Sequence, residues 1–174
     1  MIISLFKVFM SEDVLEPVNN VLMSGFLTQG QQVEKYENAL KQFLNNDKIL
    51  TLNSATSGLT LATRLLKNMD ESFNWPGLND DDVILTPALT CFATTCGILA
   101  NNMTLRWLDV DLNTANINLD DLQEKLNEKT KIIYLVHWGG NPVDLDKLDE
   151  ICEEHKYKYG FKPMVVEDCA HSFG

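Results

Sequence analysis

The chain has 174 residues, 45% of them hydrophobic, which suits a single domain with a sizeable core. Its net charge of −11, from 25 acidic and 14 basic residues, argues against nucleic acid and anionic membrane surfaces as partners, because both carry negative charge themselves. The four cysteines form no CxxC pair and the three histidines stand far apart, so no zinc template is met, and we expect no metal and reduced thiols.

Helix and strand patterns follow one another along the chain. Ser11, followed by two acidic residues, is typical of an N-cap and predicts a helix over residues 11–23; a loop at 24–30 and a second helix over 31–44 come next. Short apolar segments predict strands at 49–52, 83–86, 104–108, 131–136 and 164–167. Amphipathic segments predict helices at 57–67, 90–101, 119–127 and 144–157.

Strands that alternate with amphipathic helices are typical of βαβ units. The predicted fold class is therefore α/β, in three αβα layers with a mainly parallel sheet covered on both faces. Residues 68–79 are expected to form a long connection or a surface insertion, and we expect no boundary that divides the chain into two domains. No apolar run is long enough to span a bilayer and the first residues lack a basic leader, so we expect a cytoplasmic protein without a membrane partner.

Small and hydroxylated residues mark the passage from strand to helix near residue 54. Such a turn presents free backbone N–H groups, hydroxyls and the positive end of a helix dipole, which together suit a phosphate. The segment matches neither a P-loop nor a GxGxxG fingerprint. Taken alone, it favours plain helix capping by Ser54 or Thr56 over a phosphate site.

Asp168 follows the last predicted strand directly and has two possible interpretations. Taken alone, Asp168 is best interpreted as a residue of a solvated turn or as a helix cap. Alternatively, its carboxylate holds a heteroaromatic ring nitrogen protonated, as pyridoxal phosphate (PLP) requires when it acts as an electron sink. A phosphate cradle and a carboxylate, both at strand ends of one sheet, are together more specific than either alone.

Six segments, in the same order, resemble the DegT/DnrJ/StrS-type family of PLP-dependent nucleotide-sugar aminotransferases of fold type I. They lie at residues 25–30, 53–59, 87–90, 109–111, 136–144 and 166–174. The resemblance covers nearly the whole chain. It implies that residues 1–174 are the N-terminal part of an aspartate-aminotransferase-like large domain, truncated, with the C-terminal small domain absent.

The resemblance also implies a cofactor site and assigns its residues. The amides and hydroxyls around Ala55, Thr56 and Ser57 would hold the PLP phosphate. Asp168 would pair with the pyridine nitrogen, and His171 would lie near the ring hydroxyl.

Two departures from the family pattern matter. Where the family usually places an aromatic ring that stacks on PLP, this chain has Cys91, followed by Phe92, so either the sulfur covers the ring face or Phe92 turns inward. The Schiff-base lysine of the family belongs downstream, beyond Gly174. The chain alone is therefore expected to be inactive.

The resemblance predicts that the intact protein is a homodimer that converts a nucleotide-linked keto-sugar to an amino-sugar with an amino acid donor, glutamate. Some family members are sugar dehydratases in which histidine replaces the lysine, and nothing before Gly174 separates the two reactions. A third interpretation, which is not an enzyme, is a non-catalytic PLP-fold remnant that acts as a binding module, or the product of a decayed gene. The fragment of an enzyme is the favoured reading.

Overall fold

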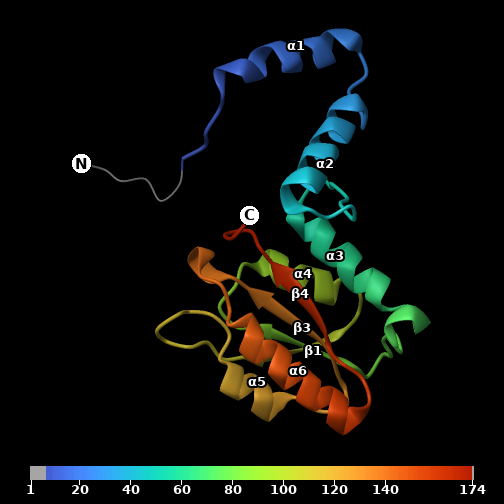
Figure 1. Cartoon of the computed structure of the whole chain (residues 1–174), viewed down its shortest axis with the longest axis vertical. Coiled ribbons are helices and arrows are strands. Elements are labelled where there is room, and N and C mark those ends of the chain that lie inside the picture. Colours follow the sequence, from blue (N-terminus) through green and yellow to red (C-terminus); the bar gives the residue numbers. More distant parts are fainter. Residues whose placement is uncertain (1–6, 174) are drawn as a thin grey trace. The chain divides into compact units, whose positions relative to one another are not determined.

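The computed structural model describes residues 7–173 and forms two compact units, Met1–Thr51 and Leu52–Gly174, each described here by itself (Figure 1). In the first unit a 3₁₀ turn, η1 (Glu12–Val14), leads into α1 (Leu15–Ser24), and α2 (Gln31–Leu44) follows. The predicted cap is confirmed, because the Ser11 side chain accepts a hydrogen bond from the Asp13 N–H. Gly25, at φ +71°, ends α1 in the left-handed region that glycine favours.

The strand predicted at residues 49–52 is wrong. A strand needs a hydrogen-bonded neighbour, and every strand that the structure describes between residues 7 and 173 lies in the second unit. Thr51 bonds to α2 instead: its hydroxyl and its N–H donate to the Glu37 carboxylate at 2.7 and 2.9 Å. The Thr51 hydroxyl, and then its backbone N–H, lower the pKa of Glu37.

The second unit is built on a four-stranded sheet in the order β2-β1-β3-β4, in which every pair is parallel. The strands are β1 (Val83–Pro87), β2 (Thr104–Leu108), β3 (Thr130–Val136) and β4 (Met164–Asp168). All five residues of β1 are buried, as expected of a central strand covered on both faces. The predicted α/β class with a parallel sheet is confirmed, and these four strands lie where the sequence predicted them.

Helices cover both faces of this sheet (Figure 1). They are α3 (Ala55–Leu66), α4 (Phe92–Leu99), α5 (Leu119–Lys125) and α6 (Leu145–Tyr159). Successive strand residues point to opposite faces, so the sheet has two cores. The core under α5 and α6 includes Leu85, Leu122, Leu135, Leu148 and Ile151. The core under α3 and α4 includes Leu59, Ile84, Ile98, Ile132 and Tyr134.

The connection at residues 68–79 is ordered and partly buried. It contains a 3₁₀ turn, η2 (Glu71–Phe73), and an isolated bridge between Asp70 and Trp75. Trp75 is only 3% exposed, belongs to the core under α3 and α4, and donates its indole N–H to the Leu66 carbonyl at 2.8 Å. The segment therefore caps one end of that core. Over residues 7–173, no helix is long and apolar enough to cross a membrane.

Candidate cofactor site

The carboxyl ends of β1, β3 and β4 lie at one edge of the sheet, and three of the predicted site residues end or follow these strands. The predicted phosphate residues 55–57 begin α3 and follow no strand, because the strand predicted at 49–52 does not form. Thr90 and Cys91 come after β1, His137 after β3, and His171 after β4. In an open parallel sheet, ligands bind at this edge, near the point where the order of the strands reverses direction. The order β2-β1-β3-β4 places that point between β1 and β3.

The first turn of α3 has the features of an anion site. Ser54 is its N-cap: the Ser54 Oγ accepts the Ser57 N–H at 3.2 Å and donates to the Ser57 Oγ at 3.1 Å. The capping prediction is thus confirmed for Ser54. The N–H groups of Ala55 and Thr56 occupy the first two helical positions, which have no acceptor within any helix, and they lie at the positive end of the helix dipole.

Asp168, the last residue of β4, is held by a donor at each carboxylate oxygen. Its Oδ2 accepts the Thr94 hydroxyl at 2.8 Å, and its Oδ1 accepts the Ala170 N–H at 3.1 Å. Thr94 lies on α4 and is fully buried, whereas Asp168 is half-buried. The Ala170 contact is the turn that the sequence predicted. The Thr94 contact was not predicted.

Tyr134 joins β3 to α3 beneath this edge. Its buried hydroxyl donates to the Leu59 carbonyl at 2.9 Å and lies 2.6 Å from the Thr63 hydroxyl. Burial raises the pKa of Tyr134; the Thr63 hydrogen bond lowers it, and the negative charge of Asp168 raises it. Tyr134 therefore stays a neutral donor near Asp168 and holds the N-terminal half of α3 against the sheet. α3 also contacts β4 and α4 directly.

His171 packs against the turn that follows β3. Its Nδ1 accepts the Gly139 N–H at 3.1 Å, which places the proton of the neutral ring on Nε2. The ring meets Trp138 edge-on, with centroids 5.6 Å apart. Gly140, at φ +82°, has no room for a side chain, since a Cβ there would lie 2.9 Å from the His171 carbonyl oxygen. The backbone of this turn thus orients His171.

Cys91 and Phe92 begin the helix that carries Thr94. Cys91 is the N-cap residue of α4 and is exposed, and its side chain makes no capping hydrogen bond. Phe92 is 71% exposed and is not turned into the protein. Both side chains therefore remain candidates to cover a ring bound beside Asp168.

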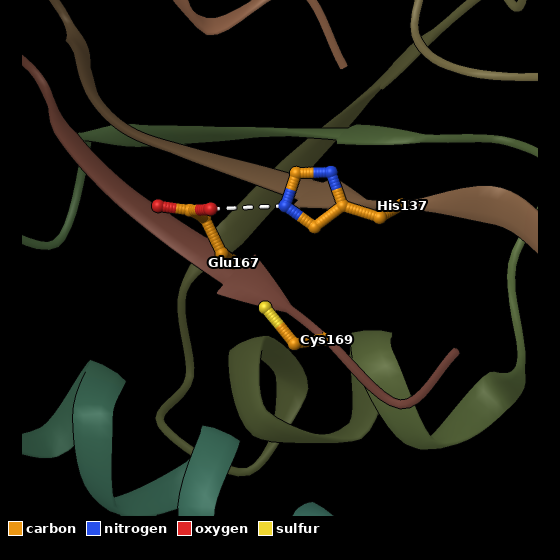
Figure 2. Close-up of side chains that lie close together, drawn as sticks. All are labelled: His137, Glu167 and Cys169. Atoms are coloured by element: carbon orange, nitrogen blue, oxygen red, sulfur yellow. Dashed lines mark hydrogen bonds and ion pairs between the residues drawn. The ribbon is translucent and has the colours of Figure 1, made fainter. Parts of the chain in front are cut away.

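The structure brings together three side chains that the sequence left apart: His137, Glu167 and Cys169 (Figure 2). Their potential ligand atoms all lie within 4.8 Å of one another, and the His137 Nε2 is 2.9 Å from the Glu167 Oε2. Glu167 precedes Asp168 on β4, so the two carboxylates point to opposite faces of the sheet. The cluster is separate from the Asp168 side of the edge.

Hydrogen bonding disfavours a metal ion in this cluster. The His137 Nδ1 accepts the Val143 N–H at 3.1 Å, so the proton of the neutral ring is on Nε2, the nitrogen that faces Glu167. A metal at Nε2 would need that proton on Nδ1 instead, where it would oppose the Val143 N–H. Burial also raises the pKa of the Cys169 thiol. The geometry instead suits a hydrogen bond that ties the end of β3 to β4.

The donors and acceptors at this edge fit PLP. The N–H groups of Ala55 and Thr56 at the start of α3 suit a phosphate, and a fixed carboxylate at the end of β4 suits a protonated pyridine nitrogen. All six residues predicted from the sequence for this site lie in the second unit.

The chain is similar to known proteins over nearly its whole length. Residues 9–174 match the model of the DegT/DnrJ/EryC1/StrS aminotransferase family. AtS13 from Actinomadura melliaura is 42% identical with a TM-score of 0.89, and the sugar aminotransferase CalS13 from Micromonospora echinospora is 40% identical with a TM-score of 0.88; each alignment covers 99% of this chain and 44% of the other.

A third similar structure is a putative sugar aminotransferase from Streptococcus pneumoniae in its PLP form. It is 27% identical with a TM-score of 0.82, and the alignment covers 95% of this chain and 42% of that one. The chain thus spans less than half the length of these solved structures. The family match over residues 9–174 establishes that the chain belongs to the DegT/DnrJ/EryC1/StrS aminotransferase family.

Proposed function

We propose that the intact protein is a PLP-dependent aminotransferase that converts a nucleotide-linked keto-sugar to an amino-sugar, with glutamate as the amino donor. Family membership supports an enzyme of the PLP aminotransferase kind. The observation that carries the proposal is Asp168, a carboxylate fixed by two donors at the sheet edge where ligands of α/β proteins bind.

Each residue of the site has a proposed task. The N–H groups of Ala55 and Thr56 and the hydroxyls of Thr56 and Ser57 bind the cofactor phosphate, aided by the helix dipole. Asp168 faces the pyridine nitrogen, and its negative charge favours the protonated ring. PLP, when bound, supplies the electron sink for transamination.

His171 is suited to orient the cofactor ring. Because its Nδ1 already accepts the Gly139 N–H, its Nε2–H is the group left to donate a hydrogen bond, and the ring hydroxyl is the acceptor proposed for it. Cys91 or Phe92 covers one face of the ring. Cys91 would do so with a small polarizable sulfur in place of an aromatic ring.

Sugar dehydration by the same cofactor is the second candidate reaction. The residue that separates the two reactions in the resemblance, lysine or histidine, belongs to a position beyond Gly174. Both reactions use the same phosphate site and the same carboxylate, so the residues described here serve either one. We also propose a cytoplasmic homodimer, whose partners are the nucleotide-sugar and the amino acid donor and do not include nucleic acid or membrane.

A binding titration tests the cofactor proposal. The protein is titrated with PLP and binding is followed by the cofactor's absorbance, for the wild type and for Asp168→Asn, a nearly isosteric change that removes the charge. We expect the variant to bind about 10- to 100-fold more weakly, because a hydrogen bond to a charged group contributes about 1.5–3 kcal/mol. The matched control is Glu167→Gln, which removes the neighbouring charge on the opposite face of β4 and should leave PLP affinity unchanged.

Four outcomes are informative. A wild-type chain that fails to bind PLP at millimolar concentration would refute the cofactor site, and equal losses in the two variants would refute the role of Asp168. If PLP binds as expected, the intact protein is incubated with PLP, glutamate and a panel of nucleotide-linked keto-sugars. Formation of 2-oxoglutarate and an amino-sugar in equal amounts supports transamination, whereas a deoxy-sugar product supports dehydration.

A further inference from the structure

We propose that Thr94 is a positioning residue for Asp168 and that Thr90 in turn holds Thr94. Together the two threonine hydroxyls fix the Asp168 carboxylate before a cofactor binds. The inference rests on the proposed role of Asp168 in binding a protonated ring nitrogen. Thr90 Oγ1 donates to Thr94 Oγ1 at 2.7 Å, and Thr94 Oγ1 donates to Asp168 Oδ2 at 2.8 Å.

The direction of both hydrogen bonds follows from the chemistry of the groups. An ionised carboxylate only accepts, and a threonine hydroxyl has one proton to donate. Thr94 must therefore give its proton to Asp168, and its oxygen is then free to accept the proton of Thr90. Because the direction of both hydrogen bonds is fixed, the Thr90 and Thr94 hydroxyls each have one preferred orientation.

Thr94 differs from Thr60 and Thr95, two other helical threonines of this unit, in how it uses its hydroxyl. The hydroxyls of Thr60 and Thr95 donate to carbonyl oxygens four and three residues earlier in their own helices, which is the usual arrangement. Thr94 instead donates across to β4, 74 residues further along the chain. Its hydrogen bond serves the sheet edge rather than its own helix.

Burial makes this contact effective. Thr94 is 0% exposed, so water does not compete for the Asp168 Oδ2 from that side. The Ala170 N–H holds the other carboxylate oxygen at 3.1 Å. With one donor at each oxygen, rotation of the carboxylate is restricted, and binding needs less reordering of the site.

The experiment compares substitutions at two adjacent threonines of α4. Thr94→Val removes the hydroxyl at nearly constant volume, and Thr94→Ser keeps it. Thr95→Val is the matched control, because Thr95 is also buried, at 3% exposed, and donates only to the Phe92 carbonyl in its own helix. Thr94→Ala removes the same hydroxyl with a residue that favours helix, and it decides the matter if the valine variant does not fold.

Two readouts are used, one without and one with the cofactor. In ligand-free crystals we expect Asp168 to leave its single position in Thr94→Val and to keep it in Thr94→Ser and Thr95→Val. With PLP labelled with nitrogen-15 in its ring, we expect about tenfold weaker binding by Thr94→Val and a ring-nitrogen signal shifted towards neutral pyridine. Thr94→Ser and Thr95→Val should keep the wild-type signal and bind within about twofold of wild type.

Failure of this inference can be told apart from failure of the cofactor site. If the wild type binds PLP but Thr94→Val binds equally well with an unchanged nitrogen signal, the positioning role is overturned and the cofactor site stands. A loss in Thr95→Val as large as that in Thr94→Val would also overturn it, since the effect would then be one of general packing. If the wild type does not bind PLP, the cofactor site falls, and an unmoved Asp168 in ligand-free Thr94→Val crystals would overturn the positioning role as well.

Discussion

Gly97→Ala and Gly58→Ala add the same methyl group to two neighbouring helices, and we expect them to change stability in opposite directions. At Gly97, on α4, an added Cβ would lie 2.8 Å from the carbonyl carbon of Leu59 and 2.9 Å from both the Leu59 O and the Thr60 N. All three atoms are backbone atoms of α3, so they cannot yield unless that helix shifts. At Gly58, on α3, the nearest atom is a terminal methyl of Leu52 at 3.8 Å, an ordinary contact.

The expected magnitudes follow from two opposing effects. Overpacking costs about 1–3 kcal/mol, and contact with backbone at this distance places Gly97→Ala near the upper value. Alanine is favoured over glycine within a helix by about 1 kcal/mol, so the net loss should be about 2 kcal/mol. Gly58→Ala keeps only the favourable effect and should gain about 0.5–1 kcal/mol. For a protein of this size, a loss of 2 kcal/mol lowers Tm by about 4–8 °C.

Urea and thermal unfolding, followed by circular dichroism, measure both variants against the wild type. A Gly97→Ala protein as stable as the wild type would refute the conclusion that α3 and α4 touch backbone to backbone. A comparable loss in Gly58→Ala would show that the effect does not come from this contact. Because the start of each helix contributes to the candidate site, Gly97→Ala should also weaken PLP binding.

Three further expectations concern single side chains. Tyr134→Phe should lower the free energy of unfolding by about 1–2 kcal/mol, because its buried hydroxyl bonds a carbonyl and a hydroxyl of α3; an unchanged urea midpoint would contradict this. The pKa of Glu37 is lowered in the folded state, so its contribution to stability is present above its unfolded value of about 4.3 and is lost as pH falls through the folded value; Glu37→Gln should flatten that dependence, and parallel curves for the two proteins would rule it out. Burial raises the pKa of Cys152 to about 11, so at pH 8 a thiol reagent should modify the exposed Cys91 and spare Cys152 until denaturant is added; mass spectrometry of the peptides checks this, and early labelling of Cys152 would be the contrary result.

Most helices and strands of the second unit are predictable from local patterns. β2 spans the five residues that its apolar pattern predicts, and in the first unit α2 begins and ends as its spacing indicates. The segment at 49–52 has an equally apolar pattern and forms no strand. This prediction is wrong because a strand is stabilised by hydrogen bonds to a neighbouring strand, and apolar residues alone do not supply such a neighbour.

The candidate site is only partly predictable. Asp168 is marked by its place at the end of an apolar strand and by the resemblance, but Thr94 lies within an apolar helix and reads as an ordinary core residue. The one local signal was the spacing of Thr90 and Thr94, four residues apart in the helix predicted at 90–101, where they would share one face. In the structure Thr90 precedes α4. His137 and Glu167 stand 30 residues apart and meet only because β3 and β4 are neighbours.

The sequence by itself determined what depends on neighbours along the chain: the caps, the helical and strand periods, the α/β class and the order of the family motifs. These are local properties, because a helix period or a Ser54 cap involves residues only a few positions apart. Tertiary structure alone decided which side chains meet: Thr94 with Asp168, and His137 with Glu167 on the opposite face of β4. Such contacts depend on strand order, register and burial, which arise only when distant segments pack together.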